Sequence, residues 1–107
     1  MTLVEKIAQE LEFDPEDVEI LLSMFTENAK ESLQQMSQAI MHHDLLTIQN
    51  SAHAIKGSAA NLMLQPISEK AREIEEAAKA GKTLDYLGLF QELETMIEEM
   101  NYDGTYA

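Results

Sequence analysis

Apolar residues recur at three- and four-residue steps along most of this chain, which is the pattern of amphipathic α-helices. The clearest example lies in the middle of the sequence, at Leu45, Ile48, Ala52, Ile55, Ala59 and Leu62. We predict a core-facing helix that begins after its N-cap, Asp44, and ends near Met63 or Leu64. Pro66 sets that end, because a proline disfavours helical geometry at the residue before it, Gln65.

Two more helices are predicted before this central one. Residues 2–11 form a short amphipathic helix. Asp14 and Pro15 then start a second helix, because Asp is a favoured N-cap and Pro suits the first helical position. Its apolar spacing continues to about Met41 or His42, so this long helix is expected to lie against the central one.

Two helices are predicted after the central one. The first has Pro66 in its first turn and stops at Gly81, and its small apolar residues predict close packing on a neighbour: Ile67, Ala71, Ile74 and Ala78. The second is capped by Thr83 and carries the apolar set Leu84, Leu87, Phe90, Leu93, Ile97 and Met100. Beyond Asn101, residues 102–107 show no periodicity and are predicted to form a loose tail.

Short connections between the four longer helices predict antiparallel neighbours. The expected fold is therefore all-α: an up-down-up-down four-helix bundle in one domain, residues 1–101, with a short additional helix at the N-terminus. Five methionines fall on or beside the apolar stripes and are predicted to fill the core: Met24, Met36, Met63, Met96 and Met100.

The charge balance is strongly acidic, with 20 Asp and Glu against 7 Lys and Arg and a net charge of −13. Such a surface repels nucleic acids and anionic membranes. It suits a partner with a basic docking face, although solubility alone would explain the acidity equally well. The absence of cysteine excludes disulfides and thiol nucleophiles. No apolar run is long enough for a membrane span and no signal-peptide pattern is present, so a cytoplasmic location is expected.

The candidate chemistry lies on the central helix. His53 is one residue past the apolar stripe, about 100° around the helix, so its side chain should point away from the core. Lys56 and Gly57 follow one turn later on the same face. An imidazole nitrogen can attack phosphorus, an ammonium group can offset phosphate charge, and a glycine leaves room for a bulky partner. Spacing alone leaves coincidence as an equal alternative, because a lone histidine on a helix is often only a half-exposed polar residue.

The order His53-x-x-Lys56-Gly57-Ser58, followed by Asn61-Leu62, resembles the signature of histidine-containing phosphotransfer (HPt) domains. These helical bundles carry a phosphoryl group between receiver domains in multistep phosphorelays, and their order of helices also resembles the one predicted here. One position departs from the family pattern. The family usually has a second glycine two residues after the position of Asn61, where this chain has Met63.

The resemblance implies a role for each residue that matches the motif. His53 would be the phosphorylated nucleophile, attacking through its outward ring nitrogen, and Lys56 would stabilise phosphate charge. Gly57, Gln49 and Ala60 are expected to contact the partner. Gln49 lies one turn before His53 on the same face, where it could also hydrogen-bond near the ring. Ser58 matches the motif but lies about 140° from His53 around the helix, which favours a packing or helix-end role.

The resemblance also implies the partners: response-regulator receiver domains and a hybrid sensor kinase. The receiver would supply Mg²⁺, and the chain would have no cofactor or metal site of its own. It would be a monomeric phosphoryl carrier without autonomous kinase activity, since it contains no glycine-rich nucleotide loop.

Three alternatives compete with this interpretation. A passive helical adaptor could bind a receiver or kinase without carrying phosphate. The chain could also be one domain of a larger hybrid or chemotaxis-type kinase. The third is a metal site at His42 and His43, which is disfavoured because adjacent residues diverge by about 100° on a helix. Their position at the end of a helix favours an interaction with the helix dipole.

Overall fold

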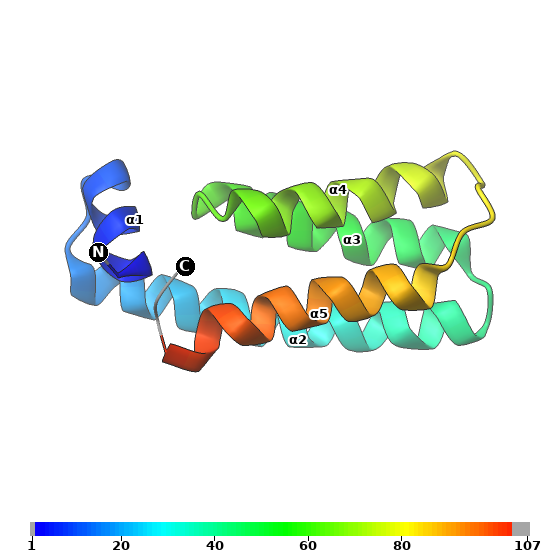
Figure 1. The fold of residues 1–107 in the computed structure, drawn as a ribbon, viewed down its shortest axis with the longest axis horizontal. Helices are drawn as coiled ribbons and strands as arrows, with labels where there is room; N and C mark the ends of the chain where they lie inside the picture. The colour runs from blue at the N-terminus through cyan, green and yellow to red at the C-terminus, as the bar shows by residue number, and fades with distance from the viewer. Residues whose placement is uncertain (1, 104–107) are drawn as a thin grey trace.

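The computed structural model describes residues 2–103, for residues 101–103 only as helical backbone, and its described part is all-α. Its helices are α1 (Leu3–Leu11), α2 (Pro15–Met41), α3 (Leu45–Asn61), α4 (Gln65–Lys79) and α5 (Tyr86–Asp103). Figure 1 shows α2 to α5 as an antiparallel bundle, with α3 and α4 on one side, α2 and α5 on the other, and α1 across one end. The predicted fold class is confirmed.

The predicted apolar stripes form one core. On α3, five of the six stripe residues are buried and Leu45, at the helix start, is half-buried. The α4 stripe is buried along its whole length, and α3 and α4 make the most extensive helix contact in the molecule. Ala52 and Ala59 on α3 and Ala71 and Ala78 on α4 are all buried, and side chains this small let two helix backbones approach closely. The prediction of close packing for α4 is confirmed.

The end of α3 differs from the prediction. The helix stops at Asn61, because Met63 has a left-handed backbone with φ of 61° that cannot continue an α-helix. The amide of Leu64 then donates to the carbonyl of Ala59 at 2.9 Å, as in a Schellman C-terminal motif. Gln65 is already helical as the first residue of α4, with Pro66 in the first turn. The expectation of a non-helical Gln65 is therefore wrong, because the preference before proline is weaker than the helix-start geometry here.

The start of α5 also differs from the prediction. Asp85, and not Thr83, caps this helix, because its carboxylate accepts a hydrogen bond from the amide of Gly88 at 3.0 Å. The helix therefore begins later than expected, which leaves Leu84 46% and Leu87 51% exposed outside the core. At its other end α5 continues to Asp103, two residues beyond the predicted stop, and the rest of the predicted tail lies outside the described residues.

The methionine prediction holds only in part. Met36 and Met100 are buried and Met96 packs against the core, whereas Met24 is 55% and Met63 39% exposed. The two exposed side chains lie where the apolar stripe meets a polar face and a helix end, so pattern alone assigned them to the wrong side.

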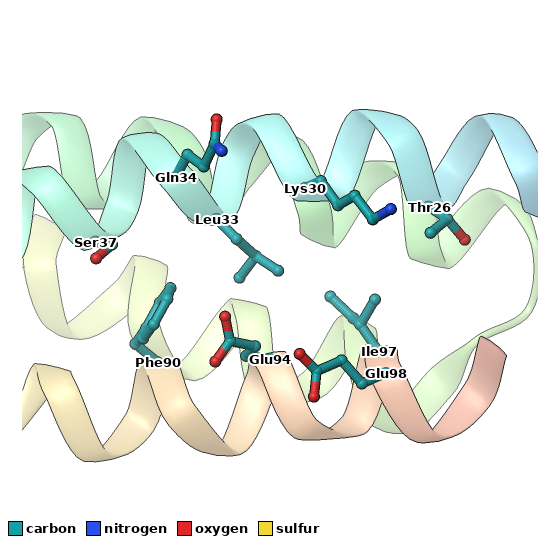
Figure 2. A pocket seen from close by; sticks show the side chains of 9 residues that line it. All are labelled: Thr26, Lys30, Leu33, Gln34, Ser37, Phe90, Glu94, Ile97 and Glu98. Atoms are coloured by element: carbon teal, nitrogen blue, oxygen red, sulfur yellow. The ribbon is translucent and has the colours of Figure 1, made fainter. Parts of the chain in front are cut away.

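On the side of the bundle formed by α2 and α5, a shallow groove with a volume of about 380 Å³ lies between these two helices. Figure 2 shows its apolar floor of Leu33, Phe90 and Ile97, with Lys30 from α2 and Glu98 from α5 at its edges. The α2–α5 contact is accordingly much less extensive than that between α3 and α4. Within the described residues, no helix combines the length and apolarity that a bilayer span requires.

Candidate phosphotransfer site

The predicted nucleophile is on the surface of α3. The His53 side chain is 67% exposed, which confirms the orientation expected from its position beside the apolar stripe. The helix backbone holds it in place through Ala52 and Ile55, which anchor the opposite face of α3 in the core. Lys56 follows one turn later, with its side chain 30% exposed. The imidazole and the ammonium group are therefore neighbours at one edge of α3.

A carboxylate from α4 joins these two groups, and sequence analysis did not identify it. One oxygen of Glu75 lies 2.5 Å from Nδ1 of His53 and the other 2.6 Å from Nζ of Lys56. The Glu75 side chain is only 12% exposed, so both contacts form at the edge of the α3–α4 interface. In the sequence Glu75 is one of several acids on α4, and its only distinguishing signal is its place directly after the buried Ile74.

Glu75 is held in its charged form. Burial by itself raises the pKa of this carboxyl group, but the hydrogen bonds and charges of Lys56 and His53 outweigh burial and hold the pKa below its ordinary value of 4.5. At neutral pH Glu75 is therefore an anion flanked by two potential cations.

The contact with Glu75 determines which nitrogen of His53 carries a proton. An ionised carboxylate can only accept hydrogen bonds, so Nδ1 must be the donor. In the neutral ring the proton then resides on Nδ1, and Nε2 keeps a free lone pair. Nucleophilic attack at phosphorus requires such a lone pair on an accessible nitrogen.

The predicted partner contacts lie along α3 on either side of His53. Gly57 and Ala60 are both exposed, four and seven residues after the histidine, and Gln49 is half-buried four residues before it. A Cβ placed on Gly57 would meet nothing within 4 Å, so the space beside the histidine is open. The hydrogen bond of the ring goes to Glu75 and not to Gln49.

The remaining motif residues, Ser58 and Asn61, take part in the local structure of α3. The Ser58 hydroxyl donates to the carbonyl of Ala54 at 2.9 Å within α3, so the hydrogen bond of this side chain is local to the helix. Asn61 is the exposed last residue of α3. A further tie comes from Ser68 on α4, whose hydroxyl donates to the carbonyl of Lys56 at 3.1 Å and links the two helices beside the site.

The two adjacent histidines terminate α2. His42 is its C-cap, and His43 adopts a left-handed backbone with φ of 55°. Among the described side chains, residues 2–100, no three His, Asp or Glu gather in a way that could hold a metal ion.

Comparison with known proteins agrees with this geometry. The family model described as "Hpt domain" matches residues 20–102, which is most of the chain. The chain belongs to the Hpt domain family. Histidine phosphotransfer in phosphorelays is therefore the class of function to which this Hpt domain belongs.

The fold of this Hpt domain also resembles a solved structure, that of histidine-containing phosphotransfer protein B (HptB) from Pseudomonas aeruginosa PAO1. The TM-score is 0.79 at 20% sequence identity, over 94% of this chain and 84% of the other. At this identity the likeness concerns the fold. No curated protein matches the sequence of this Hpt domain significantly.

Proposed function

We propose that this Hpt domain carries a phosphoryl group between receiver-domain aspartates in a cytoplasmic phosphorelay, with His53 as the phosphorylated residue. The observation that carries the proposal is the exposed imidazole whose Nδ1 is held by Glu75 beside Lys56, in a chain of the Hpt family. The proposed partners are response-regulator receivers and a hybrid sensor kinase. In this scheme the receiver supplies Mg²⁺, and the Hpt domain acts as a monomeric carrier with no kinase activity of its own.

The proposed transfer step uses the free nitrogen of His53. The Nε2 lone pair attacks the phosphorus of an aspartyl phosphate, an N–P bond forms, and the P–O bond to the aspartate breaks to release its carboxylate. Nδ1 keeps its proton, so the phosphorylated ring carries a positive charge. The anionic Glu75 lies 2.5 Å from this nitrogen and stabilises that charge as it develops. Attack by a second receiver aspartate on the same phosphorus reverses these steps.

Lys56 has a second task in the same step. Its ammonium group has three N–H donors, and the contact with Glu75 uses one of them. The others are free to meet phosphoryl oxygens on the ring nitrogen one turn away. Gly57 has no side chain and Ala60 only a methyl group, so the α3 surface is open toward an approaching receiver.

The experiment is phosphoryl transfer from a panel of labelled receiver phosphates to the full chain. We expect label on the Hpt domain that survives base and is lost in acid, which identifies phosphohistidine. The His53→Gln variant should accept no label while keeping its helical circular dichroism. His42→Gln, a change at another exposed histidine, is the matched control and should accept label normally.

Two outcomes would contradict the proposal. Label retained by His53→Gln would show that another residue is phosphorylated. Receivers that bind the chain but never transfer label to it would favour a passive adaptor.

A further inference from the structure

The positive charges of this chain are concentrated on the side of the bundle that carries His53. Residues 45–82, which contain α3 and α4, hold five Lys and Arg against four Asp and Glu, whereas the rest of the chain holds two against sixteen. Within α3 itself there is no Asp or Glu. The side formed by α3 and α4 (Figure 1) is therefore close to neutral in a chain of net charge −13, and an anion can approach it with the least repulsion.

Phosphorylation of His53 would add charge that Glu75 and Lys56 do not balance. A phosphoryl group on a side chain carries about two negative charges at neutral pH, and a ring that keeps its Nδ1 proton carries one positive charge. Glu75 and Lys56 already neutralise each other in their contact at 2.6 Å. The phosphorylated site therefore has an excess of about one negative charge, which one further cation would balance.

Lys79 is placed to supply this cation. It is the exposed last residue of α4, four residues after Glu75, so the two side chains lie on the same face of the helix. Side chains in a helix lean toward its N-terminus, which directs Lys79 back toward Glu75 and the imidazole that Glu75 contacts. Lys56 leans toward His53 on α3 for the same reason. Because α3 and α4 are antiparallel, the two lysines approach the imidazole from opposite ends.

Its position distinguishes Lys79 from the other cations of the chain. Lys79 makes no ion pair with any described residue, including Glu76 three positions before it. The other lysines without an ion pair among the described residues lie on α1 and beyond the end of α4. Arg72, one turn before Glu75, leans away from the site and already donates to Glu69 at 2.7 Å. Lys79 is therefore the cation of α4 that is both directed toward the imidazole and available.

We propose that Lys79 is a second cationic contact of the phosphoryl group on His53, on the opposite side from Lys56. This inference rests on the phosphorylation of His53 proposed above and adds to it a residue of α4 that lies outside the motif of α3. The ammonium group of Lys79 donates to phosphoryl oxygens on Nε2, so that the phosphorylated site is close to neutral. At the end of α4, Lys79 also interacts favourably with the helix dipole, a structural role that needs no phosphate.

The test uses the full chain phosphorylated by phosphoramidate, a small donor that requires no receiver. Nε2 of His53 forms the N–P bond, the P–N bond of the donor breaks, and ammonia leaves. The pH titration of the phosphorus chemical shift then reports the charge around the phosphorylated ring. Lys79→Gln should move the midpoint to higher pH, with a proton affinity about threefold greater, because a unit charge about 6 Å away in water contributes that factor. The difference should shrink in about 1 M salt.

Two variants separate the charge of Lys79 from other effects. Lys79→Arg keeps the charge and should titrate like the wild type. Lys30→Gln is the matched control, because it removes the same charge from an exposed lysine at the groove between α2 and α5, on the other side of the bundle (Figure 2). Its midpoint should equal that of the wild type. Urea unfolding of each variant measures the helix-dipole contribution separately, since that contribution does not move the titration.

Three results would overturn the role of Lys79 while leaving His53 as the phosphorylated residue: an unchanged midpoint in Lys79→Gln, an equal shift in Lys30→Gln, or an equal shift in Lys79→Arg. A different result would overturn the proposed function and this inference together. It is a wild type that takes no label from the donor, or a His53→Gln variant that takes as much label as the wild type. The two failures are therefore distinguishable in one set of samples.

Discussion

Glu75 gives His53 a fixed tautomer and a counter-charge, two properties that an exposed histidine lacks on its own. Its carboxylate accepts from Nδ1 at 2.5 Å and from Lys56 at 2.6 Å, so the nitrogen that remains for chemistry is Nε2. A neutral amide at position 75 could still orient the ring, but it could not offset the charge of a phosphorylated imidazole.

Glu75→Gln should therefore slow transfer to His53 without preventing it. Charge-assisted hydrogen bonds are about twice as strong as neutral ones, and a loss of about 1.4 kcal/mol corresponds to a tenfold lower rate. Single-turnover transfer from a phosphorylated receiver measures the effect. Glu76→Gln, the neighbouring exposed acid, is the control and should transfer at the normal rate. An unchanged rate in Glu75→Gln would show that Glu75 only ties the helices together.

At Gly57, a side chain should favour the stability of the helix but obstruct the receiver. Apart from its chain neighbours and the backbone of its own helix, nothing lies within 4 Å of a Cβ built there, so Gly57→Ala should stabilise the helix by about 0.5–1 kcal/mol, measured by urea unfolding. Gly57→Leu should also fold, but its side chain should obstruct the receiver and reduce the transfer rate about tenfold or more. Normal transfer by Gly57→Leu would remove this residue from the docking surface.

Met63 occupies a backbone conformation that favours glycine. Its φ of 61° brings the Cβ close to the backbone, at a cost of about 1 kcal/mol. Met63→Gly should relieve this strain and raise the free energy of unfolding by about that amount. Met63→Ala distinguishes backbone strain from loss of the methionine side chain, because it removes that side chain beyond the Cβ but keeps the Cβ itself. If both variants change stability equally, the backbone strain is not the reason.

At the scale of whole elements, periodicity predicted the helices and their buried faces but missed some of their ends. A cap depends on one local hydrogen bond, and Thr83 and Asp85 are equally plausible caps from sequence. The structure chooses Asp85, whose carboxylate bonds the amide of Gly88. This choice starts α5 late and leaves Leu84 and Leu87 about half exposed, outside the core.

The cap also explains a glycine inside a helix. A Cβ on Gly88 would collide with the carboxylate of Asp85, so any other residue there must shift the cap. Gly88→Ala should therefore destabilise the protein by about 1 kcal/mol, although alanine is the better helix former. The opposite sign expected for Gly57→Ala makes the pair a direct comparison by urea unfolding. A stabilised Gly88→Ala variant would mean that the cap contributes little.

At the scale of the molecule, the contact between α3 and α4 is the most extensive in the bundle; both helices carry buried alanines, and Glu75 of α4 pairs with Lys56 of α3. The α2–α5 side is looser and contains the groove of Figure 2. The proposed phosphotransfer site therefore lies on the pair of helices with the most extensive contact, which favours a fixed geometry for the imidazole of His53.

The contacts of Glu75 with His53 and Lys56 make the free energy of unfolding depend on pH. The pKa of Glu75 in the folded protein lies below its ordinary value of 4.5, so its contribution is present above that pH and is lost as pH falls below it toward the folded pKa. Between pH 7 and pH 3, the wild type should lose more free energy of unfolding than Glu75→Gln. Urea unfolding across this range measures the difference, and Glu76→Gln should follow the wild type. Parallel curves for wild type and Glu75→Gln would contradict a charged Glu75 bridge.

The sequence by itself determined the all-α class, the buried stripes and the outward face of His53, Lys56 and Gly57. These features depend on the 3.6-residue period, which is a local property of the chain. The tertiary structure alone decided that Glu75, 22 residues from His53, bridges it to Lys56, and that Leu84 and Leu87 remain outside the core. Such contacts depend on how two helices are rotated and offset against each other, and packing of the whole core sets that arrangement.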